Sequence, residues 1–177
     1  YRTGAFLTNR TLVREANFHR GFETFIENNA YKLHQKAELL HEHLFPWLAA
    51  NPEQPIFANA HYMEVHDPYR APEEYAYLFF PEDYPLPPMI HRGEVTPYQN
   101  IILMEGRQPD IPEEKIEEII TLYDACIRNI DDRIADLFRF LEQNNLRENT
   151  IIWITSDHGE ELFDHGSVKH GYTLYDE

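Results

Sequence analysis

The stretch Thr150-Ile-Ile-Trp-Ile-Thr-Ser-Asp-His-Gly-Glu160 decides how this sequence is interpreted. Residues 150–155 are apolar or β-branched without polar alternation, which predicts a strand buried on both faces of a parallel sheet. Asp157 and His158 follow at the carboxyl end of this predicted strand. Ligands of open α/β sheets bind just outside such ends. Because a carboxylate and an imidazole are both good metal ligands, the pair indicates half of a metal site.

An Asp-His-Gly tripeptide also fits a capped turn, in which Asp157 would accept hydrogen bonds from the backbone. For three residues alone, the turn is the better interpretation. The sequence then continues with a dense group of acids, histidines and one lysine, namely Glu160, Glu161, Asp164, His165, Lys169 and His170. Such a group behind one buried strand favours a functional site over a solvated loop.

A second apolar run, residues 55–65, predicts another buried strand, and His66-Asp67-Pro68-Tyr69 follows at its carboxyl end. On its own, His66 would be a turn residue. Its place behind a second predicted strand repeats the arrangement of Asp157 and His158. His61 lies five residues earlier, so it is a candidate for a supporting role.

The rest of the chain predicts an α/β fold. Residues 1–8 are typical of a strand, and 36–50 have apolar side chains at helical spacing. A long helix is predicted within 110–144, where a cap, an early proline and acids open a regular apolar stripe. Residues 70–111 are rich in proline, which predicts an irregular loop or lid. In that loop, His91 and Arg92 are candidates to contact an anion, although a solvated loop explains them as well.

Composition limits the class of protein. The chain has 177 residues, of which 42% are hydrophobic, so it is globular and long enough for a real core. The net charge of −16 disfavours nucleic acid as a partner, since that needs a basic surface. Cys126 is the single cysteine, so the chain holds no internal disulfide. No run of eighteen apolar residues occurs, so no transmembrane helix is predicted in this chain.

Three segments together strongly resemble the sulfatase family of the alkaline-phosphatase-like superfamily. They are Ser156-Asp-His-Gly-Glu160, Asp164-His-Gly166 and His170-Gly-Tyr-Thr-Leu-Tyr-Asp-Glu177. The resemblance implies a layered α/β/α sheet, with residues 1–177 forming part of a single catalytic domain and 70–111 its irregular loop or lid. Since the sequence opens within a strand-like run and stops inside the third segment, we expect it to be an internal piece of a longer protein.

The resemblance also implies roles for individual residues. Asp157 and His158 would bind a divalent cation together with an upstream pair of aspartates; calcium is expected first, with manganese or zinc as alternatives. His66 and His170, or Lys169 in place of His170, would contact the anionic head of the substrate. The remaining candidates, His61 and His165, would support these residues.

The implied activity is the metal-dependent hydrolysis of sulfuric esters. In sulfatases the nucleophile is a formylglycine made in a Cys/Ser-x-Pro-x-Arg motif, and this chain has no such motif. We therefore expect residues 1–177 to be inactive alone. Two alternatives stay open: a phosphodiesterase or phosphoethanolamine-type transferase of the same superfamily, or a non-catalytic relative that serves as a binding module. The expected substrates of an active enzyme are anionic sulfate or phosphate esters.

Overall fold

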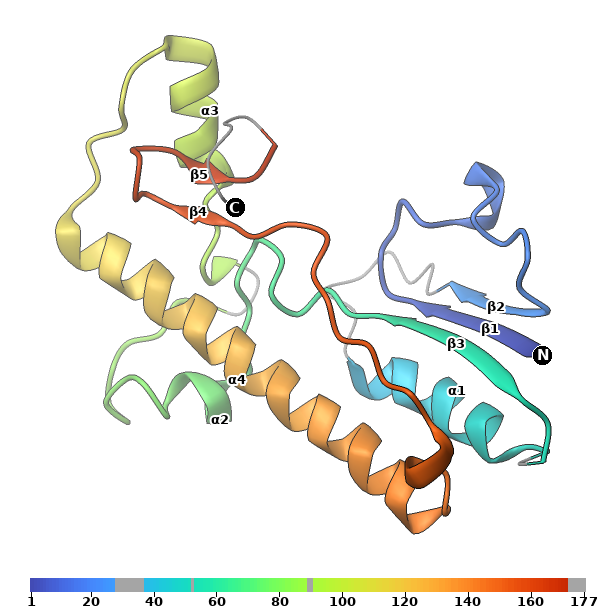
Figure 1. The fold of residues 1–177 in the computed structure, drawn as a ribbon. Coiled ribbons are helices and arrows are strands. Elements are labelled where there is room, and N and C mark those ends of the chain that lie inside the picture. Colours follow the sequence, from blue (N-terminus) through green and yellow to red (C-terminus); the bar gives the residue numbers. More distant parts are fainter. Residues whose placement is uncertain (28–36, 52, 89–90, 172–177) are drawn as a thin grey trace. The chain divides into compact units, whose positions relative to one another are not determined.

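The computed structural model describes residues 1–27, 37–51, 53–88 and 91–171 (Figure 1). The chain divides into two compact units. The first unit contains residues 1–64 and 130–151, and the second contains 65–129 and 152–177. Each unit is described by itself.

A three-stranded parallel sheet forms the centre of the first unit (Figure 1). Its middle strand is β1 (Arg2–Leu7), with β2 (Thr24–Glu27) on one side and β3 (Ile56–His61) on the other. Strand β1 confirms the strand predicted at 1–8, and β3 confirms a shorter strand within 55–65. The predicted burial of that second strand is wrong, because no residue of β3 is buried and Phe57 is 56% exposed. Strand β2 was not predicted, because its four residues are too few to show a period.

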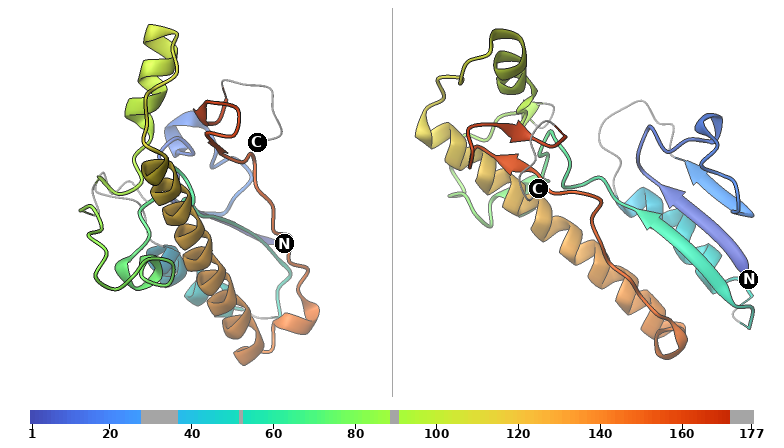
Figure 2. Two further views of the ribbon diagram at one scale, coloured as in Figure 1. Left: turned by 90° about the vertical axis from the view of Figure 1, so that its left-hand side faces the viewer. Right: turned by 45° about the horizontal axis from the view of Figure 1, so that its top comes forward.

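Helix α1 (Ala37–Ala49) packs against this sheet, as the right view of Figure 2 shows. It confirms the helix predicted at 36–50. A Cβ atom added to Gly4 would lie 2.8 Å from the ring of Trp47, so the absence of a side chain on β1 lets the helix approach the sheet. The helix buries Leu40, Leu44 and Leu48. A short 3-10 turn, η1 (Arg14–Ala16), lies in the connection between β1 and β2.

Helix α4 (Glu113–Gln143) confirms the long helix predicted within 110–144. It begins directly behind Pro112, with acids in its first turn, and its first half carries Ile119, Leu122 and Cys126 into the core of the second unit. Its second half belongs to the first unit and is followed by the 3-10 turn η3 (Arg147–Asn149). Within the described ranges, no helix is long and apolar enough to cross a membrane.

The second unit combines helices with a small hairpin. Its elements are α2 (Glu73–Ala76), α3 (Thr96–Glu105), the first half of α4, and the antiparallel strands β4 (Glu161–Leu162) and β5 (Val168–Lys169). Its core is lined by Tyr69, Ala71, Ala76, Val95, Ile119, Leu122, Ala125, Cys126 and Val168. Helices α2 and α3 show that the segment 70–111 is more regular than its prolines predict.

Arg92 has a structural role in this segment. Its side chain is buried, and its guanidinium donates hydrogen bonds to the carbonyl oxygens of Ala71 (2.8 Å) and Pro87 (3.2 and 3.3 Å). The interpretation of Arg92 as a contact for an anionic substrate is therefore wrong: its donors hold the main chain. His91, in contrast, has a side chain that is 69% exposed.

The strand predicted at 150–155 is not formed in the structure. These residues belong to no strand, and the side chains of Ile151 (98%) and Trp153 (85%) are exposed. An apolar run becomes a buried strand only where a neighbouring strand completes its hydrogen-bond ladder. Across the part of the chain that the structure describes, no strand pairs with this run. The α/β class is confirmed by the parallel sheet and its helices, whereas the full α/β/α layering stays a prediction.

Candidate functional site

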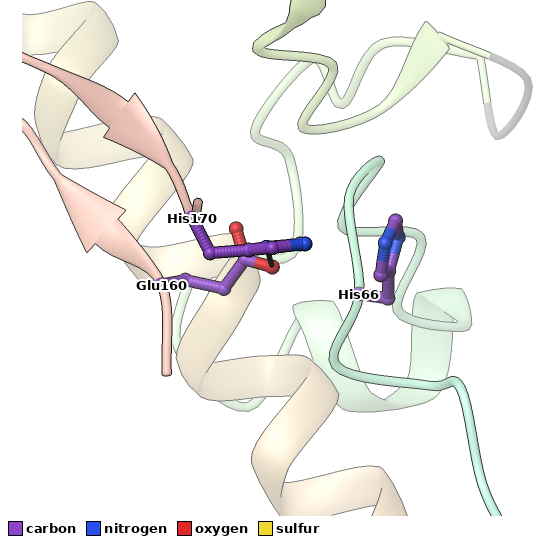
Figure 3. A group of neighbouring side chains, drawn as sticks. All are labelled: His66, Glu160 and His170. Carbon is purple, nitrogen blue, oxygen red and sulfur yellow. Dashed lines mark hydrogen bonds and ion pairs between the residues drawn. The ribbon is translucent and has the colours of Figure 1, made fainter. Parts of the chain in front are cut away.

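The β4–β5 hairpin brings Glu160 and His170 together. In this hairpin Glu161 pairs with Lys169, so the residues just outside that pair, Glu160 and His170, face each other across the two strands. His170 Nδ1 lies 2.9 Å from Glu160 Oε1 (Figure 3). The turn between the strands is closed by Glu161, whose carboxylate accepts hydrogen bonds from turn backbone N–H groups.

Glu160 is held from a second side by Tyr69. The Tyr69 hydroxyl donates to Glu160 Oε2 at 3.0 Å, and the Glu160 side chain is only 4% exposed. Burial, and after it the charge of Glu160, raises the pKa of the Tyr69 phenol, so this hydroxyl remains a hydrogen-bond donor. Both oxygens of the carboxylate are therefore occupied, and its orientation is fixed.

His66 faces His170 from the turn that opens the second unit. The two rings meet edge to face, with centroids 5.5 Å apart and planes at 71°, and Figure 3 shows the ring of His170 pointing toward that of His66. Ligand atoms of His66, Glu160 and His170 all lie within 4.8 Å of one another. We call these three side chains the His66–Glu160–His170 group.

An ion pair between a buried aspartate and a half-buried lysine joins the residues next in sequence to the two histidines. Lys169 Nζ lies 3.0 Å from Asp67 Oδ2, and both side chains bond to the hydroxyl of Thr96 at 3.0 Å. Asp67 Oδ1 also accepts from the backbone N–H of Val95 (2.9 Å), directly before α3. A carboxylate at a helix N-terminus is favourable because it meets unpaired N–H groups and the positive end of the helix dipole. The Asp67 carboxylate thus links the turn that carries His66 to α3 and to β5, the strand that precedes His170.

Asp157 and His158 lie beside this group. The rings of His158 and His170 are stacked, with centroids 3.6 Å apart and planes at 28°. His158 Nε2 is 3.6 Å from Asp157 Oδ1, while His158 Nδ1 lies 2.7 Å from the carbonyl oxygen of Gly159. Two ligands of one cation are separated by roughly 3–4 Å, so this donor pair fits a shared divalent ion. The Asp157 side chain is exposed, which leaves room for further ligands.

The structure brings four of the seven predicted site residues together and places the other three outside that group. His66, Asp157, His158 and His170 lie in one neighbourhood of the second unit. Lys169 lies next to them, but its ammonium is engaged by Asp67 and Thr96. His165 lies in the hairpin turn, where its backbone N–H donates to Glu161. His61 is the last residue of β3 in the first unit, and its carbonyl accepts from Thr8. The functional roles assigned to all of these residues stay predictions.

Sequence reasoning missed the partners that orient these side chains. Glu160 was noted only as one acid among several, and Tyr69, Asp67 and Thr96 were given no role. The signal that could have found Glu160 is the Asp164-His-Gly166 turn, because a tight turn there brings residue 160 opposite residue 170. No such local signal exists for Thr96, which is 73 residues from Lys169.

Comparison with known proteins identifies one family. The profile of the Sulfatase family matches residues 1–177. The chain is 26% identical over 147 residues to the multifunctional alkaline phosphatase superfamily protein PehA of Trinickia caryophylli, covering 74% of this chain and 29% of that protein. It is 30% identical over 126 residues to iduronate 2-sulfatase of Mus musculus, covering 63% of this chain and 23% of the relative.

An arylsulfatase of Klebsiella aerogenes is 27% identical over 131 residues, which cover 64% of this chain and 28% of the relative. The chain therefore spans less than a third of the length of each of these three proteins. The match to the family extends from the first residue to the last and includes the stretch that carries Asp157, His158, Glu160 and His170. The chain belongs to the sulfatase family.

Proposed function

We propose that the protein to which this chain belongs hydrolyses sulfate esters, releasing an alcohol and sulfate. The observation that carries the proposal is the pair of metal-type donors, Asp157 and His158, beside two further histidines in a chain of the sulfatase family. The names of two relatives, iduronate 2-sulfatase and arylsulfatase, support the same class of substrate.

In this proposal Asp157 and His158 hold a divalent cation, for which calcium is our first choice and manganese or zinc are alternatives. When bound, the cation supplies a positive charge that polarises the ester oxygens. The oxygen of Asp157 suits calcium, whereas the nitrogen of His158 also suits manganese or zinc. His158 is prepared for ligation, because the Gly159 carbonyl orients its ring from the far side.

His66 and His170 line the position of the anionic head. Glu160 fixes the ring of His170, and the backbone of Asp67 fixes that of His66, so neither ring has to be ordered when an ester binds. Lys169 supports this arrangement through its ion pair with Asp67. No cysteine or serine of this chain lies in a Cys/Ser-x-Pro-x-Arg motif, so we expect residues 1–177 alone to turn over no ester.

The test is an assay of the intact protein with 4-nitrophenyl sulfate and, in parallel, bis(4-nitrophenyl) phosphate. We expect turnover of the sulfate ester, and a loss of about a hundredfold or more in kcat/KM for Asp157→Asn and His158→Ala. The control is His43→Ala, which removes an exposed imidazole from α1 of the first unit rather than a candidate residue of the second unit. Turnover of the phosphate diester alone would move the protein to phosphoryl transfer, and full activity of both site variants would overturn the proposed roles.

A further inference from the structure

Two side-chain torsions decide where His170 points, and neither has a strong preference of its own. The imidazole turns about its Cβ–Cγ bond and the carboxylate of Glu160 about its Cγ–Cδ bond, and both torsions have broad, roughly two-fold minima. The stack of His170 on His158, with centroids 3.6 Å apart, restrains the plane of the ring. A half-turn of the ring keeps this plane but exchanges the places of its nitrogen and carbon atoms. Another contact must therefore select one of the two orientations.

The hydrogen bond to Glu160 makes this selection. His170 Nδ1 lies 2.9 Å from Glu160 Oε1, as the dashed line in Figure 3 marks. After a half-turn, a ring C–H group would face the carboxylate in place of the N–H donor. The bond therefore holds Nδ1 at Glu160 and leaves Nε2 as the ring nitrogen that can meet a ligand. The direction of Nε2 is then only as definite as the position of the Glu160 carboxylate.

Tyr69 supplies the fixed end of this chain of contacts. Its hydroxyl donates to Glu160 Oε2 at 3.0 Å and so occupies the oxygen that His170 does not. The Tyr69 side chain is fully buried in the core of the second unit, where its ring meets Tyr123 of α4 edge to face, with centroids 5.1 Å apart. A phenol oxygen cannot move without its ring, and a ring packed in a core has little freedom. The hydroxyl therefore keeps the carboxylate from turning.

We propose that Tyr69 is a positioning residue of the site, which acts through Glu160 to fix the direction of His170 Nε2 toward the anionic head of the ester. The inference rests on the proposed function, in which His170 contacts that head. Packing alone would be served equally well by phenylalanine, because the ring fills the core. The hydroxyl adds a fixed donor that lies two contacts away from the ester.

The experiment is a double-mutant cycle on the intact protein, assayed with 4-nitrophenyl sulfate. Tyr69→Phe keeps the ring in the core and removes only the hydroxyl. We expect it to lower kcat/KM about tenfold, because a small displacement of a group that contacts the substrate slows the reaction. In the His170→Gln background the same change should alter kcat/KM less than about twofold, since its route to the ester is gone. Equal losses in the two backgrounds, or no loss in either, would overturn the inference.

Tyr123→Phe is the matched control. It removes the hydroxyl of the ring against which Tyr69 packs, and it should leave kcat/KM within about twofold of the wild type. Circular dichroism checks that each variant folds, because Tyr69→Phe removes the donor of a buried carboxylate oxygen. If Tyr69→Phe does not fold, Glu160→Gln replaces it in the cycle. Its loss of kcat/KM should likewise vanish in the His170→Gln background, and an equal loss in both backgrounds would overturn the inference.

A spectroscopic measurement reads the same contact without turnover. In protein labelled with ¹⁵N-histidine, the Nδ1–H resonance of His170, identified by its loss in His170→Gln, reports the hydrogen bond to Glu160. We expect this resonance to shift or broaden in Tyr69→Phe and to stay unchanged in Tyr123→Phe. An unchanged resonance in a folded Tyr69→Phe protein would contradict the positioning role.

The two readouts separate this inference from the proposed function. A protein that turns over no sulfate ester, but whose His170 resonance changes in Tyr69→Phe, refutes the proposed hydrolase and supports the positioning of His170 by Tyr69. A protein that hydrolyses the ester equally well with and without the Tyr69 hydroxyl supports the hydrolase and refutes the positioning role.

Discussion

The imidazole of His158 lies almost parallel to that of His170, with the ring centroids 3.6 Å apart. This contact joins the segment that begins with Asp157 to the hairpin that ends with His170. The stack therefore couples the orientation of one ring to that of the other, so a change in either segment is felt at both histidines.

The pair of Asp67 and Lys169 should be strongly coupled. We expect Asp67→Asn and Lys169→Met each to destabilise the protein by roughly 3 kcal/mol, because each variant leaves the other charge buried without its partner. The double variant should cost less than the sum, by about 1–3 kcal/mol. Urea denaturation of the wild type, the two single variants and the double variant measures this coupling energy.

A matched control for that cycle is the exposed pair of Glu105 and Arg107, whose charged atoms are 2.7 Å apart. Exposed pairs contribute little, so its coupling energy should stay below ~1 kcal/mol. If the losses from Asp67→Asn and Lys169→Met simply add, these residues do not hold the site together as described.

Helix α4 offers a comparison of one side chain in two environments. Ile119 is fully buried in the core of the second unit, whereas Ile127, two turns later, is 44% exposed. Ile119→Ala should reduce the free energy of unfolding by about 2–5 kcal/mol, from lost burial and the cavity left behind. Ile127→Ala should cost less than about 1 kcal/mol, and equal losses in the two variants would contradict the packing of the helix.

The first unit should lose stability in acid through His41. Burial is the main cause that lowers the pKa of this side chain below 6.5, while Asp136 and Glu38 partly oppose it and Arg133 adds to it. The ring also bonds to the hydroxyl of Tyr62 at 2.9 Å. On acidification the unfolded chain takes up its proton first, so the free energy of unfolding should fall as the pH drops below 6.5 toward the folded-state pKa.

Denaturation of the wild type and of His41→Gln over this pH range measures the effect. The variant should show a smaller dependence on pH than the wild type. Identical slopes for the wild type and His41→Gln would show that another group is responsible.

Local patterns predicted the regular elements of this fold well. The apolar spacing in residues 36–50 and 110–144 corresponds to α1 and α4, and the apolar runs near residues 1–8 and 55–65 correspond to β1 and β3. In each case the signal lies within the element itself. Pro46 lies inside α1, which continues to Ala49.

Long-range partners could not be predicted in the same way. Residues 150–155 have the composition of a buried strand, but burial depends on a neighbouring strand that a local pattern does not specify. At the site, the sequence indicated His66, Asp157, His158 and His170 as candidates, and the structure places them in one neighbourhood. The contact of Tyr69 with Glu160 joins residues 91 positions apart, and no periodicity reports such a pair.

The buried guanidinium of Arg92 has a consequence for how this protein can change in evolution. It closes the chain from Ala71 to Arg92 into a ring, and its hydrogen bonds go to the carbonyl oxygens of Ala71 and Pro87. Every residue type has a carbonyl oxygen, so this closure places little demand on the side chains between its two ends. The closure therefore constrains the main chain rather than the side chains of the ring, whereas Ala76 within it is constrained by its own burial in the core.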